Sequence, residues 1–88
     1  MVFMNNIPTK RKIAPKDHWE EVVKRLLKAE LARKGVGHEQ LSVLLADMGI
    51  NISKSAIDSK LSRGTFSAAF LMQCLMAIKC NKLRIEAE

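Results

Sequence analysis

Residues 35–64 have the sequence GVGHEQLSVLLADMGINISKSAIDSKLSRG, which decides the fold because it holds two short helical patterns joined by a turn. In the first pattern the apolar residues recur at helical spacing, at Leu41, Leu44, Leu45 and Met48. This predicts a helix from His38 to Met48, which Gly49 can end because glycine adopts a positive φ at no steric cost. The turn is expected at Gly49–Ile52.

The second pattern predicts a helix whose first backbone amides are capped by the side chain of Ser53 or Ser55. Ile57 and Leu61 lie one turn apart on its buried side, and Gly64 ends it. Its outward face is polar and mostly short-chained: Lys54, Ser55, Asp58, Ser59 and Ser62.

One further helix is predicted before this pair and another after it. The earlier helix begins at Asp17, whose carboxylate can cap it, and runs to about Lys34. Its inward apolar residues are Trp19, Val22, Val23, Leu26, Leu27 and Leu31. The later helix is capped by Ser67 and ends near Lys79. Its apolar band is Phe70, Leu71, Cys74, Leu75 and Ile78. We therefore predict an all-α fold, a compact four- to five-helix domain.

The 88 residues suffice for one small domain. We assign residues 1–16 to a flexible basic arm, 17–80 to the helical domain and 81–88 to a C-terminal tail. Within the tail, residues 82–86 alternate polar and apolar, which predicts a short strand that pairs with another chain or packs on the rim. No apolar run approaches the ~20 residues that span a bilayer, and no signal peptide is evident, so we expect a cytoplasmic protein.

The chain carries 15 Lys and Arg against 9 Asp and Glu, a net charge of +6, which attracts polyanions. Residues 1–34 hold 9 basic and 4 acidic side chains, and residues 35–88 hold 6 and 5. Most of the excess is therefore N-terminal, and Lys10, Arg11 and Lys12 are its densest cluster. Such a cluster suits electrostatic anchoring to nucleic acid, although basic tails are as often merely solubilising.

Catalysis has little support in the sequence. His18 and His38 have no nucleophile or metal-ligand partner at a recognisable spacing. Cys74 and Cys80 lie six residues apart in an apolar segment, which favours buried free thiols over a metal site or a disulfide. We expect no enzyme activity, no cofactor, no metal and no small-molecule substrate. The methionines on apolar faces are expected in the core or at a dimer interface: Met48, Met72 and Met76.

A helix that enters the DNA major groove needs an outward face of donors and small side chains, a bracing helix and nearby cations. Residues 38–63 supply these features. The candidate base-reading residues are Lys54, Ser55, Asp58, Ser59 and Ser62. The candidate phosphate contacts are His38, Gln40, Lys60, Arg63, Thr65, Lys10, Arg11 and Lys12. The alternative for this outward face is a simple solvated surface. Asp58 repels phosphate unless it accepts from a cytosine amino group or pairs with Lys54.

Residues 27–35, 40–42 and above all 60–70 (KLSRGTFSAAF) resemble a small bacterial and phage domain family of unknown function. More distantly, the order of helices is similar to lambda-repressor-like and Cro-like regulators, which use the third helix for base contacts and commonly bind as dimers. The sequence departs from that pattern in two places. The segment Asp47–Ser53 is longer, and Ser62 stands where Glu often precedes Arg-Gly.

These features favour a sequence-specific regulator of transcription, a repressor that binds a palindromic operator in double-stranded DNA as a homodimer. An antitoxin-like or adaptor module is the alternative, with the Met-rich last helix docking a partner protein. A membrane-surface role ranks third, because the apolar stripe of the first helix is better explained as core.

Overall fold

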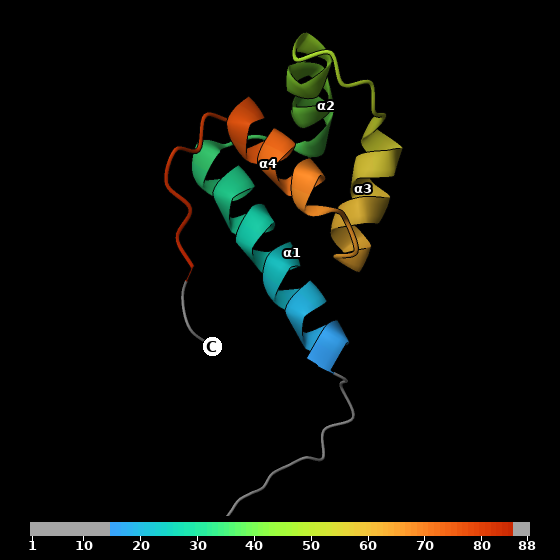
Figure 1. The fold of residues 1–88 in the computed structure, drawn as a ribbon. Helices are drawn as coiled ribbons and strands as arrows, with labels where there is room; N and C mark the ends of the chain where they lie inside the picture. The colour runs from blue at the N-terminus through green and yellow to red at the C-terminus, as the bar shows by residue number, and fades with distance from the viewer. Residues whose placement is uncertain (1–14, 86–88) are drawn as a thin grey trace, which may run out of the picture.

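The computed structural model describes residues 15–85, and this part of the chain is all-helical, with four helices and no strand (Figure 1). The helices are α1 (Pro15–Lys34), α2 (His38–Asp47), α3 (Lys54–Arg63) and α4 (Ala68–Ala77). Both α1 and α2 pack against α3 and α4. The predicted fold class is thus confirmed at the level of a compact helical bundle. No helix in residues 15–85 has the length and apolarity needed to cross a membrane.

The core lies where the four helices meet. The side chains with no exposed surface come from every helix: Leu27, Leu41, Leu45, Ile57, Leu61 and Cys74. Full burial of a large aliphatic side chain contributes about 1.5–3 kcal/mol, so this cluster supplies much of the driving force for folding. The expected inward positions of α2, α3 and α4 are confirmed at these residues.

Three helices end in the same way. Just past α1, α2 and α4, one residue takes a positive φ, and the next backbone N–H donates to a carbonyl five residues earlier. The positive-φ residue is Gly35 after α1 and Gly49 after α2, but it is Lys79, with φ of 60°, after α4. A residue with a Cβ loses roughly 1–2 kcal/mol in this region, so Lys79 is held there by its surroundings.

The chain ends differ from the sequence prediction. Helix α1 begins at Pro15, two residues before the expected start at Asp17, because the fixed φ of proline suits the first position of a helix. The strand expected at residues 82–86 is not formed in its described part, 82–85. This segment has no strand beside it within residues 15–85, and Leu83 instead packs on the helical core.

Four apolar side chains that were expected inside lie largely in solvent. Trp19 is 60% exposed, because α1 has 20 residues and its first turns extend beyond the ten-residue helices packed against it (Figure 1). Met48 is 45% exposed at the end of α2. Met72 and Met76 are 56% and 55% exposed on the side of α4 that no other described helix covers. A core role for these methionines is therefore wrong, and an interface role stays a prediction.

Candidate nucleic-acid interface

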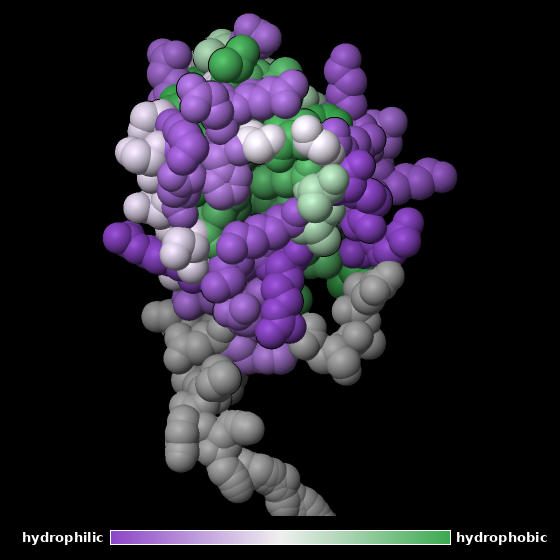
Figure 2. Space-filling model, turned by 180° about the vertical axis from the view of Figure 1, so that it is seen from behind, coloured by the Kyte–Doolittle hydropathy of each residue, from purple (hydrophilic) through white to green (hydrophobic). Residues whose placement is uncertain are grey.

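The outer face of α3 carries the five residues expected to read bases. Lys54, Ser55, Ser59 and Ser62 are exposed, and Asp58 is half-buried. The opposite side of the helix is anchored by Ile57 and Leu61, which have no exposed surface. Figure 2 shows residues of intermediate hydropathy, drawn near white, along the edge of the molecule where α3 lies. One side of α3 thus exposes polar, mostly short side chains, and its other side is packed against the core.

Asp58 is paired on both of its carboxylate oxygens. Oδ2 accepts from Nζ of Lys54 at 2.8 Å, the i, i+4 pairing expected from the sequence. Oδ1 lies 2.5 Å from Nδ1 of His38, the first residue of α2. The hydrogen bond from Lys54, followed by that from His38, holds the pKa of Asp58 below its usual value. The same carboxylate raises the pKa of Lys54. This arrangement ties the start of α2 to the middle of α3.

The start of α3 is fixed by two serine hydroxyls. Oγ of Ser53 accepts from the backbone N–H of Ala56 at 3.1 Å, so Ser53 is the cap and Ser55 is not. Oγ of Ser42, on α2, donates to the carbonyl of Ile52 at 2.6 Å. The connection between α2 and α3 covers residues 48–53, which is longer than the turn of 3–4 residues common in helix-turn-helix units.

The end of α3 lies directly against α1. Gly64 has φ of 75°, and a Cβ at this position would stand 2.5 Å from the backbone oxygen of Glu20. Nζ of Lys24 donates to the carbonyl of Ser62 at 3.3 Å, which satisfies one of the free carbonyls at this helix end. A glycine is therefore required here both for the backbone conformation and for the close approach.

The residues expected to contact phosphates lie in three places. His38 and Gln40 are at the start of α2, with His38 engaged by Asp58 and Gln40 exposed. Lys60, Arg63 and Thr65 are all exposed at the far end of α3. Nζ of Lys60 also lies 5.4 Å from the centroid of the Phe70 ring, a cation–π distance. Lys10, Arg11 and Lys12 lie outside the described residues.

Sequence reasoning missed the contribution of α1 to this region. Lys24 of α1 reaches the end of α3 and also pairs with Glu21 at 3.1 Å. Trp19 and Gly64 line a hollow of about 270 Å³ beside that helix end, together with Glu20, Val23, Thr65 and Phe66. No local signal could have revealed the contacts of Lys24 with Ser62 and of Glu20 with Gly64, because each joins residues about 40 positions apart.

The thiols offer no evident chemistry. Cys74 and Cys80 are free and buried, as predicted. Burial raises the pKa of Cys74 to about 12, and burial followed by the nearby Glu30 also raises the pKa of Cys80. Both therefore stay protonated at neutral pH and are poor nucleophiles. Within residues 15–85, no three His, Cys, Asp or Glu side chains are grouped in a way that could hold a metal ion.

Comparison with known protein families identifies a match over most of the chain. A family model described as a domain of unknown function, DUF6471, matches residues 19–83. This description names no helix-turn-helix or Cro-like family. No curated protein and no solved structure matches the chain.

Proposed function

The chain belongs to the DUF6471 family, and we propose that it is a sequence-specific DNA-binding regulator of transcription. In this proposal it acts as a repressor, with α3 in the major groove and two copies bound to a two-fold-related operator. The single observation that carries the proposal is the way in which α3 is exposed and held in place. It is an exposed polar helix held at its start, its middle and its end by other parts of the fold.

Rigid support matters because base readout depends on placing short side chains accurately at base edges. The Ser53 cap and the Ser42 hydroxyl fix the start of α3. Gly64 and Lys24 fix its end against α1. Serine hydroxyls on such a helix can donate to or accept from several bases.

The paired state of Asp58 favours DNA binding over repulsion. An unpaired carboxylate on the groove face would disfavour a phosphate-rich partner. Here the Asp58 charge is offset by Lys54 at 2.8 Å, and His38 is the second partner. Lys54 is correspondingly less available for bases, so we assign most of the readout to Ser55, Ser59 and Ser62.

The cations at the end of α3 supply the phosphate contacts in this proposal. Lys60 and Arg63 are exposed there, next to the exposed hydroxyl of Thr65. Such contacts position a protein on DNA and make its affinity depend on salt, but they carry no sequence information. In the proposal, the basic residues 10–12 add further phosphate contacts of this kind.

The test is fluorescence anisotropy with labelled fragments from around the gene that encodes the chain, titrated with salt. Ser55→Ala with Ser59→Ala should lower the ratio of specific to non-specific affinity by about tenfold or more. Arg63→Gln should weaken binding to all fragments alike and reduce the salt slope by about 1. Lys28→Gln, an equal charge change at an exposed site on α1, is the matched control and should have little effect. Equal affinity for all fragments would exclude a sequence-specific regulator.

A second function is favoured by the exposed face of α4. Met72 and Met76 are one turn apart, and methionine is common at binding surfaces that adapt to a partner. In this alternative the chain is an antitoxin-like or adaptor module that docks a partner protein through α4. It predicts a complex with a neighbouring gene product that survives high salt and is lost in Met72→Gln with Met76→Gln. If α4 instead forms the homodimer, the same variant is monomeric in sedimentation experiments, with no second protein required.

The membrane-surface role loses its motivation. Leu27 and Leu31 of α1 are buried in the core, so they are not available to a lipid surface.

A further inference from the structure

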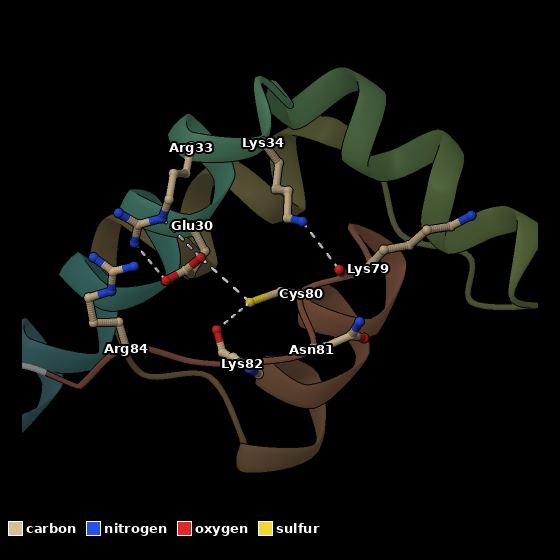
Figure 3. A pocket seen from close by; sticks show the side chains of 8 residues that line it. All are labelled: Glu30, Arg33, Lys34, Lys79, Cys80, Asn81, Lys82 and Arg84. Carbon is tan, nitrogen blue, oxygen red and sulfur yellow. Dashed lines mark hydrogen bonds and ion pairs between the residues drawn. The ribbon is translucent and has the colours of Figure 1, made fainter.

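A second basic region lies on the side of the molecule away from α3, between the last turns of α1 and the segment that follows α4 (Figure 1). The two segments line an open pocket of about 320 Å³, within the size range of small-molecule sites (Figure 3). Its lining residues are Glu30, Arg33, Lys34, Lys79, Cys80, Asn81, Lys82 and Arg84. None of these eight residues is aromatic, so a ligand would be recognised by charge rather than by stacking.

The pocket is built around a buried carboxylate. Glu30 is only 4% exposed, and Arg33 donates to both of its oxygens, from Nη2 at 2.7 Å and from Nε at 3.3 Å. The thiol of Cys80 donates to the same carboxylate at 3.5 Å. These bonds, that from Arg33 foremost, hold the pKa of Glu30 below its usual value. Glu30 therefore joins the tail to α1 and orients Arg33.

The charge of the lining is strongly unbalanced. Five cationic side chains surround one carboxylate, a net charge of +4. Within residues 15–85, no carboxylate pairs with Lys79, Lys82 or Arg84, and Lys34 donates only to the carbonyl of Lys79, at 3.3 Å. In Figure 3 the guanidinium groups of Arg33 and Arg84 lie toward Glu30, whereas the Lys79 side chain extends away from it. Two arginines from different segments thus approach one pocket.

We propose that this pocket binds a small anion that carries phosphate groups. The guanidinium group of Arg84 can bind phosphate in a bidentate fashion, whereas Arg33 already gives Nε and Nη2 to Glu30 and adds mainly charge. Lysines add charge without a fixed geometry. The volume of the pocket, about 320 Å³, fits a compact anion. This ligand goes beyond the DNA-binding proposal and does not rest on it, because the pocket shares no residue with α3.

The test is a titration of the ¹⁵N-labelled full chain with inorganic pyrophosphate, followed by two-dimensional NMR at constant ionic strength. The expected result is saturable shifts of the backbone amides of residues 33–34 and 79–84, with residues 54–62 unmoved. Lys82→Gln with Arg84→Gln should weaken binding by at least about tenfold. Lys28→Gln, which removes one positive charge at an exposed site outside the pocket, is the control and should change the affinity less than about twofold. Inorganic phosphate and a nucleoside triphosphate, titrated in parallel, show whether the phosphate alone or a larger molecule that carries it is preferred.

Three outcomes would overturn the proposal. The first is no saturable shift at millimolar pyrophosphate. The second is an equal loss of affinity in Lys28→Gln, because that would mean diffuse attraction to the net charge. The third is that duplex DNA shifts residues 79–84 while none of the small anions does, which would make the pocket part of a nucleic-acid surface. Thermal unfolding of each variant, measured without ligand, verifies that a loss of affinity is not a loss of fold.

Discussion

Nδ1 of His38 lies 2.5 Å from Oδ1 of Asp58, so the first residue of α2 is joined directly to the middle of α3. The relative orientation of two helices adjacent in sequence is often set only by their packing and by the length of the connection between them. Here the connection has six residues, 48–53, and side-chain contacts restrict the geometry further. The orientation of α3 therefore depends on a pair of titratable groups.

This pairing predicts acid sensitivity. The pKa of Asp58 is lowered in the folded chain, first by Lys54 and then by His38. Its stabilisation is thus present above the pKa of the unfolded chain, about 4, and is lost as the pH falls through the lower folded value. Chemical denaturation from pH 7 down to acid should show wild type more stable than Asp58→Asn at neutral pH. The difference should vanish below both pKa values. A difference that does not change with pH would contradict this assignment.

The close approach of Gly64 to Glu20 predicts a large penalty for a methyl group. Gly64→Ala places a Cβ 2.5 Å from a backbone oxygen and also strains a φ of 75°. We expect a loss of about 3 kcal/mol in the free energy of unfolding, because both effects add. Gly49→Ala is the matched control: its φ is 86°, but a Cβ there meets no heavy atom within 4 Å. It should cost only about 1 kcal/mol. Equal losses in the two variants would show that the contact with α1 is unimportant.

The cap of α3 predicts unequal roles for two serines that are two residues apart. Ser53→Ala removes the acceptor for the backbone N–H of Ala56 and should cost about 1 kcal/mol. Ser55→Ala removes no cap and should stay within about 0.5 kcal/mol of wild type. Urea denaturation measures both changes. A larger loss in Ser55→Ala than in Ser53→Ala would show that Ser55, and not Ser53, caps α3.

Lys79 predicts a stabilising substitution. Glycine adopts a φ of 60° without steric strain, whereas the Cβ of Lys79 destabilises the folded chain by roughly 1–2 kcal/mol there. The greater conformational freedom of glycine in the unfolded chain reduces this gain in stability by about 0.4–1 kcal/mol. We expect Lys79→Gly to gain about 0.5 kcal/mol, which raises Tm by about 2–4 °C in a domain of this size. Lys79→Ala keeps the positive-φ cost and should show no such rise. Equal Tm values for the two variants would mean that the backbone strain is negligible.

The helices were predictable because their signals are local. Ser67 caps α4 through the backbone N–H of Phe70, at 3.0 Å, and Gly64 ends α3 in the left-handed region, both as expected. The periodicity that placed Ile57 and Leu61 inside also held, because one side of a helix packed on two others must be apolar. The pairing of Asp58 with Lys54 follows from helical spacing alone.

The residues whose burial was predicted wrongly are those whose exposure depends on helix length and on which other helices pack beside them. Trp19 has the spacing of a core residue but is 60% exposed, because only the residues just after α3 lie beside it, across a hollow. Met72 and Met76 are apolar on a helix that is apolar nearly all round, and periodicity cannot tell which side the other helices cover. The alternation at residues 82–86 needs a partner strand that residues 15–85 do not supply.

By itself the sequence determined the four helices, the Ser67 cap of α4 and most of the core, because these depend on hydrogen bonds and spacing within a few residues. Only the tertiary structure decided that His38 holds Asp58, that Gly64 touches Glu20 and that Glu30 joins α1 to the tail. Each of these contacts joins residues between 20 and 50 positions apart. Their geometry is set by how the helices pack, which no short stretch of sequence encodes.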